Sequence, residues 1–86
     1  MISNQLNIID GIDPGVDALK KLGNRIKTLR MQAGHHYFEK FADQNGIGRV
    51  LLRRAELGGN ITYNDLLKII SALGITTAEF FSEGFD

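Results

Sequence analysis

Hydrophobic positions recur at spacings of three and four along most of the chain, which is the pattern of an α-helix with one apolar face. The clearest series lies between Pro14 and Gly34 and consists of Val16, Leu19, Leu22, Ile26 and Leu29. Asp13-Pro14 is typical of a helix start, with an N-cap followed by proline at the first helical position. Gly34 predicts the helix end. Because glycine weakens a helix interior, Gly23 leaves a later start near Lys20 as an alternative.

Two short helices are expected after this one. The second runs from about residue 37 to 44, and its inner face consists of Phe38, Phe41 and Ala42. Asn45-Gly46 is typical of a helix stop followed by a tight turn. The third helix runs from Gly48 to Leu57. At about 100° per residue, Leu52 and Ala55 face inward, with Glu56 near their edge. The opposite side carries Arg49, Val50, Arg53 and Arg54.

Threonine capping motifs predict the start of two further helices. The Thr62 hydroxyl can accept a hydrogen bond from the amide of Asp65, and the Asp65 carboxylate can reach back, as in a capping box with Asp in place of Glu. Gly74 ends this fourth helix, whose apolar residues are Leu66, Leu67, Ile69, Ile70 and Leu73. Thr76 begins the fifth helix, and Glu79 completes a second capping box. The whole pattern predicts an all-α protein of five helices.

The chain is short enough to form one domain. It has 86 residues, a length typical of a single small domain. The segment MISNQLNIIDGI has neither a helix cap nor a helical period, so residues 1–15 are expected to form a flexible tail and residues 16–86 the domain. Alternatively, the apolar side chains of Leu6, Ile8 and Ile9 could add a strand or a patch to a partner.

Charge is strongly segregated along a chain whose formal net charge is zero. Residues 1–19 carry three acidic and no basic residues, residues 20–54 carry nine basic and two acidic residues, and residues 55–86 carry five acidic and one basic residue. The three segments therefore have net charges of −3, +7 and −4. A basic block between acidic ends indicates a polyanionic partner, although chance clustering on solvated helix faces would produce the same pattern.

Composition argues against several other functions. The chain has no cysteine, which excludes disulfides and thiolate metal or redox sites and fits a cytoplasmic protein. It has no apolar run long enough to span a membrane and no secretory leader. His35 and His36 are adjacent, so their side chains point in different directions and do not form a bidentate metal site. With no phosphate-binding loop and no nucleophile–base pair, we expect no enzyme activity, cofactor or metal.

Four stretches, taken in order, resemble one known family. LGNRIKTLRMQAG is similar to its first helix, and Ala42 with Gly46 matches the small residue and turn glycine of its second. GIGRVLLRRAELGGN is similar to its recognition helix and the following loop, and LLKIISALGITTAEFF to its last two helices. From Leu22 to Phe85 the chain thus resembles the Cro/phage-repressor (Xre) family of helix-turn-helix domains. The resemblance implies a lambda-repressor-like fold and a homodimer that binds double-stranded DNA as a sequence-specific transcriptional regulator of repressor type.

The resemblance also implies roles for individual residues. The third helix would read the major groove, where an arginine fork can bind guanine or a phosphate with two hydrogen bonds. The expected base contacts are Arg49, Val50 and Arg53. The expected backbone contacts are Tyr37, Lys40, Arg54 and Asn60. Arg30 and Glu56 are expected to form a structural ion pair beneath the recognition helix.

A protein-interaction or antitoxin-like module is the alternative function. Helix-turn-helix domains can serve as platforms for a protein partner, and the aromatic C-terminal segment offers a surface. Phe80 and Phe81 are expected to close the core over the first helix, whereas Phe85 is harder to bury within one subunit. The fourth and fifth helices and the Phe85 end are therefore the candidate dimer interface.

Overall fold

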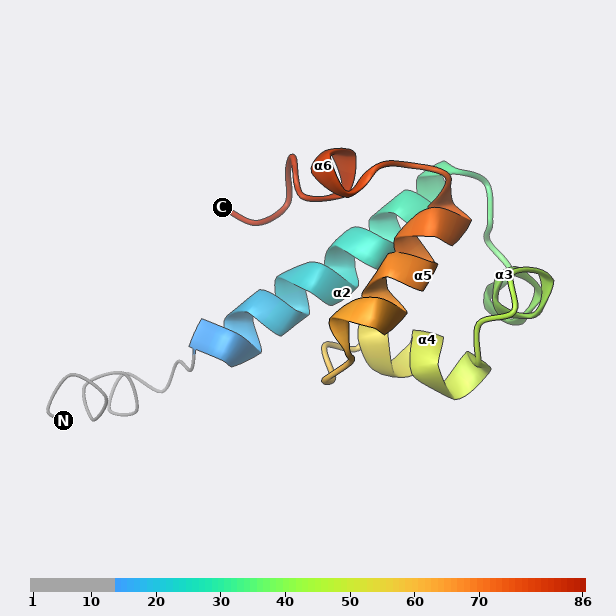
Figure 1. Cartoon of the computed structure of the whole chain (residues 1–86), viewed down its shortest axis with the longest axis horizontal. Helices are drawn as coiled ribbons and strands as arrows, with labels where there is room; N and C mark the ends of the chain where they lie inside the picture. Colours follow the sequence, from blue (N-terminus) through green and yellow to red (C-terminus); the bar gives the residue numbers. More distant parts are fainter. Residues whose placement is uncertain (1–13) are drawn as a thin grey trace, which may run out of the picture.

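The computed structural model describes residues 14–86, and within this range the chain is all-α. The helices run α2 Pro14–Gln32, α3 Phe38–Gln44, α4 Arg49–Glu56, α5 Tyr63–Leu73 and α6 Thr77–Phe80. The long α2 crosses the molecule with α5 beside it, α4 lies under one end of α5, and α6 lies above α2, on the side away from α4 (Figure 1). This confirms the all-α prediction. The expectations for residues 1–13 lie outside the described residues. None of the described helices is long and apolar enough to cross a membrane.

Helix α2 begins at Pro14, so the earlier of the two predicted starts is correct. Ile26 is completely buried, and Leu22 and Leu29 pack against the core. Val16, however, is 49% exposed, and its predicted place on the buried face is wrong. The first turns of α2 extend beyond the other helices, so no core lies beneath the start of its apolar stripe (Figure 1).

Gly23 lies where α2 packs against the backbone of α4. A Cβ atom at this position would lie 2.5 Å from the carbonyl oxygen of Ala55 and 2.6 Å from that of Glu56. Both are backbone atoms of α4 and its end, which a rotamer change cannot move. The glycine that weakens the helix by propensity is therefore required by packing.

The core lies between α2, α4 and α5. Its largest completely buried side chains are Phe41, Phe80, Ile26, Leu52 and Ile69. These residues come from all five described helices, so even the short α3 and α6 each contribute one phenylalanine. Apolar burial of this kind supplies most of the free energy of folding in a small domain.

The helix caps follow the sequence closely. The amide of Glu79 donates to the Thr76 hydroxyl and the amide of Thr76 donates to the Glu79 carboxylate, at 3.1 and 3.0 Å, which is a complete capping box. The hydrogen bonds that the amide and the hydroxyl of Thr76 donate to the Glu79 carboxylate lower the pKa of Glu79. At Thr62 the hydroxyl accepts from the amide of Asp65, but within the described chain the cap lacks the expected return bond. Aspartate is one methylene shorter than glutamate, which accounts for the difference.

Arg25 fastens the C-terminal segment to α2. Its Nε donates to the carbonyl of Phe80 at 2.7 Å, its Nη2 to the carbonyl of Glu79 at 2.9 Å, and its Nη1 lies 3.3 Å from the Glu83 carboxylate. The arginine itself is buried. A charged side chain thus satisfies the carbonyls at the end of α6, which no further helical turn can do.

Three phenylalanines meet at the C-terminal end. Phe80 is buried, as expected, but Phe81 is 42% exposed, so its predicted core position is wrong. Phe85 is half-buried within the single chain and packs on the core, with ring centroids 5.0 Å from Phe81 and 6.0 Å from Phe80. The turn after α6 folds the chain back, which brings Phe85 rather than Phe81 against the core.

Candidate nucleic-acid interface

The exposed side of α4 combines arginines with apolar side chains. Leu52 and Ala55 are buried, as predicted. The opposite side, here called the α4 outer face, consists of Arg49, Val50, Arg53, Arg54 and Leu57, which line a shallow groove of about 330 Å³. Val50 is 74% exposed and Leu57 is 77% exposed. Exposed apolar side chains set among arginines give this face both apolar and cationic groups.

A short turn holds α4 against α3. The turn spans residues 45–48, with Gly46 at a φ of +65°, and the two helices cross steeply (Figure 1). Ile47 is buried, and its amide donates to the carbonyl of Ala42 at 2.9 Å. This anchor was not predicted from the sequence, although a lone apolar residue in a glycine-rich turn was a usable signal. The buried isoleucine keeps the start of α4 from swinging away from α3.

Arg30 and Glu56 form the expected ion pair. The Arg30 Nε lies 2.7 Å from one carboxylate oxygen and its Nη2 lies 3.0 Å from the other. The two side chains are only 5% and 8% exposed. The Arg30 Nη1 also donates to the carbonyl of His35 at 2.7 Å. One guanidinium therefore ties the end of α2, the loop before α3 and the end of α4 together.

Phe38 supports Arg53. The Arg53 guanidinium lies over the Phe38 ring, 4.6 Å from its centroid, and the Arg30 guanidinium lies 5.5 Å from the same centroid. Phe38 is half-buried, so it is both a core residue and the platform for an exposed arginine. Such a cation–π interaction restricts the long arginine side chain. Helical periodicity placed Phe38 on an inner face but did not predict this interaction.

Arg49 has a carboxylate partner in the protein itself. Its Nε donates to Oδ1 of Asp43 at 3.0 Å, and its Nη2 donates to Oδ2. These hydrogen bonds lower the pKa of Asp43 and raise that of Arg49. The pair therefore stays charged around neutral pH. Both side chains are more than half exposed.

The residues expected to contact the DNA backbone lie on the borders of α4 and α3. Within residues 14–86, no carboxylate forms an ion pair with Arg54. The aliphatic part of its side chain packs against the backbone of Gly59. Asn60 is exposed in the loop that follows. Lys40 is exposed on α3, and Tyr37 is 77% exposed at its start. All four side chains are accessible; Arg54 belongs to the outer face, and the other three lie outside it.

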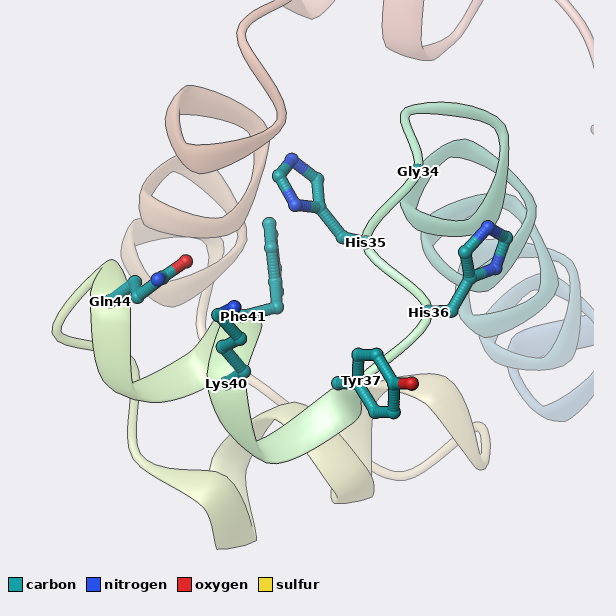
Figure 2. A pocket seen from close by; sticks show the side chains of 7 residues that line it. All are labelled: Gly34, His35, His36, Tyr37, Lys40, Phe41 and Gln44. Atoms are coloured by element: carbon teal, nitrogen blue, oxygen red, sulfur yellow. The ribbon is translucent and has the colours of Figure 1, made fainter.

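The loop before α3 separates its two histidines. The ring of His35 points toward the ring of Phe41, with centroids 5.0 Å apart, whereas His36 and Tyr37 point away from it (Figure 2). Together with Lys40 these side chains line a hollow of about 310 Å³. Within the described residues, no group of three or more histidine, cysteine or acidic side chains is placed to hold a metal ion. His35 is half-buried against Phe41 and packs at the edge of the core.

No protein-family model, curated protein or solved structure matches this chain.

The arginines without a carboxylate partner among residues 14–86 both lie on the α4 outer face. Of the arginines in residues 14–86, Arg25 and Arg30 are buried, and their guanidinium groups bind other groups of the protein. Arg49 shares its charge with Asp43, whereas Arg53 and Arg54 have no carboxylate within the described part of the chain. Leu57 and Val50 are the apolar neighbours of these two arginines. The surface therefore suits a ligand with both anionic and apolar groups, such as a nucleic acid groove.

Proposed function

We propose that this protein binds double-stranded DNA in a sequence-specific manner and acts as a transcriptional regulator of the repressor type. In this proposal α4 enters the major groove, which is wide enough for an α-helix. The observation that carries the proposal is the α4 outer face: arginines and exposed apolar side chains on a helix whose other side is buried and fastened by the Arg30–Glu56 pair. A rigidly held reading surface is what sequence recognition requires.

The interactions with bases would come from three residues on this face. Arg53 is restricted by Phe38 and can offer its fork to guanine O6 and N7. Arg49 at the start of α4 can do the same. The exposed Val50 methyl groups suit the methyl group of thymine. Together, these hydrogen-bond donors and methyl groups would distinguish one base pair from another and also bind the groove.

The surrounding polar residues would position the protein on the phosphates. Arg54 is exposed on the outer face, and Asn60, Tyr37 and Lys40 are exposed outside it. Phosphate interactions of this kind set register and orientation without reading sequence. A homodimer would place two α4 helices about 34 Å apart, one turn of DNA, on a two-part site.

The decisive experiment is a binding selection from random duplex DNA, followed by titration of the enriched sequence at several salt concentrations. An enriched motif whose affinity falls steeply with salt supports the proposal and gives the half-site spacing. Salt-sensitive binding without a motif would reduce the proposal to nonspecific DNA binding. No binding at low salt would contradict it and leave the protein-interaction module as the better function.

Replacing Arg53 with alanine is expected to weaken binding to the preferred site by about 2 kcal/mol and to relax one base position, because the variant cannot form two hydrogen bonds to a base. The measurement is a titration of the enriched site and of its single-base variants. Lys68→Ala, which removes one positive charge from α5, is the matched control. If base preference is unchanged in Arg53→Ala, Arg53 touches only the DNA backbone.

Replacing Arg54 with alanine is expected to act differently. Because Arg54 would bind a phosphate, its removal should weaken binding to all sequences alike and reduce the slope of log affinity against log salt by about 1. Titrations of the enriched site and of a scrambled duplex at four salt concentrations would measure both effects. A weakening confined to the enriched site would instead move Arg54 into the group that reads bases.

A further inference from the structure

Asp43 lies in the last turn of α3 and Arg49 is the first residue of α4, so their pair bridges the turn between the two helices. The carboxylate engages the guanidinium through two atoms, Nε and Nη2. Two hydrogen bonds of this parallel kind fix the plane of the guanidinium as well as its position. Arg49 thus has a set orientation before any ligand arrives.

The pair occupies only one edge of the guanidinium. An arginine has five N–H donors, and Asp43 takes the Nε–H and one N–H of Nη2. The edge formed by Nη1 and the second N–H of Nη2 has no partner among the described residues. These are two parallel donors, the arrangement that binds O6 and N7 of guanine.

Stability does not explain an aspartate at this position. Asp43 is near the C-terminus of α3, where a negative charge opposes the helix dipole. Its ion pair is exposed, and exposed ion pairs contribute little to folding. The carboxylate also places a negative charge beside a surface otherwise rich in arginine, which weakens attraction to phosphates. An acid that opposes both helix stability and nonspecific DNA binding needs another role.

We propose that Asp43 is a positioning residue that directs the free edge of Arg49 to a guanine and keeps this arginine from binding a phosphate instead. This inference rests on the proposed function and adds to it a predicted base, a guanine opposite the start of α4. It also predicts that specificity and nonspecific affinity respond in opposite directions when the carboxylate is removed.

The test compares wild type, Asp43→Asn, Arg49→Ala and the double variant on the enriched site, on its variants at each guanine, and on a scrambled duplex. Asp43→Asn is expected to bind the scrambled duplex more tightly than wild type, because one negative charge is gone. Its preference for guanine at one position should fall about tenfold, the effect expected when a bidentate arginine–guanine pair is disrupted. Arg49→Ala should lose preference at the same position, and the double variant should lose no more than Arg49→Ala.

Several results would overturn the inference. Asp43→Asn could keep the full guanine preference, or it could lose preference at a position that Arg49→Ala does not affect. If the wild type enriches a motif and Asp43→Asn reads it unchanged, the inference fails and the proposed function stands. If the wild type enriches no motif, the proposed function itself fails. Thermal melting of each variant checks folding, and Asp43→Ser replaces Asp43→Asn if the latter melts early.

Discussion

Replacing Glu56 with alanine is expected to lower the free energy of unfolding by about 3–5 kcal/mol, because it leaves the Arg30 guanidinium buried without its carboxylate. Both side chains are more than nine-tenths buried, so water cannot replace the missing partner. Native proteins of this size have only about 5–15 kcal/mol of stability in total. Much of the variant should therefore be unfolded near body temperature, which thermal and urea denaturation followed by circular dichroism would measure.

Two controls separate burial from charge. Asp17→Ala breaks the exposed pair with Lys21, whose atoms lie 3.2 Å apart, and should cost about 0.5 kcal/mol or less. The double variant Arg30→Met, Glu56→Leu removes both charges and should recover much of the stability, since apolar residues of similar volume can replace a buried pair. A Glu56→Ala variant as stable as Asp17→Ala would show that water reaches the pair.

Replacing Gly23 with alanine is expected to cost about 3 kcal/mol, at the upper end for overpacking. The new methyl group would meet two backbone carbonyl oxygens at 2.5 and 2.6 Å, so α2 and α4 would have to move apart. Helix propensity alone predicts the opposite sign, since alanine favours a helix over glycine by about 1 kcal/mol. A lower melting temperature would show that overpacking dominates, and a higher one would show that helix propensity dominates.

Gly48→Ala is the matched control for this substitution. Gly48 is the N-cap of α4, and a Cβ atom there would meet only the Leu51 Cβ, at 3.9 Å. Its cost should be about 0.5–1 kcal/mol, because alanine is a poorer N-cap than glycine. A rise in the melting temperature of Gly23→Ala would mean that the two helices do not pack closely. If Gly23→Ala still folds, a displaced α4 should also weaken DNA binding, although residue 23 itself does not touch DNA.

Local signals in the sequence predicted much of this fold. Threonine caps and left-handed glycines bound the helices where expected, and the complete capping box at Thr76 depends on neighbouring residues alone. The buried side of α4 followed from helical geometry, because Leu52 and Ala55 share one face. The Arg30–Glu56 pair was expected only through the family resemblance, since nothing local relates residues 26 positions apart.

Apart from the missing return bond at Thr62, the errors and omissions concern packing between elements. Val16 continues the apolar stripe of α2, but its side chain is exposed because the other helices do not extend far enough to cover it. Phe81 and Phe85 exchanged their expected places because the turn after α6 decides which ring meets the core. Phe38 became a platform for Arg53 through the crossing of α3 and α4. Periodicity indicates which face of a helix is apolar, not which neighbour covers it.

The close packing of α2 and α4 at Gly23 determines which substitutions on α4 this protein tolerates. The angle of α4 is set by backbone against backbone and by the buried pair at its end, both on the side away from the exposed arginines. Substitutions at Val50 therefore leave these contacts unchanged. If the outer face binds DNA as proposed, single exchanges on this face would change the base preference with little loss of stability.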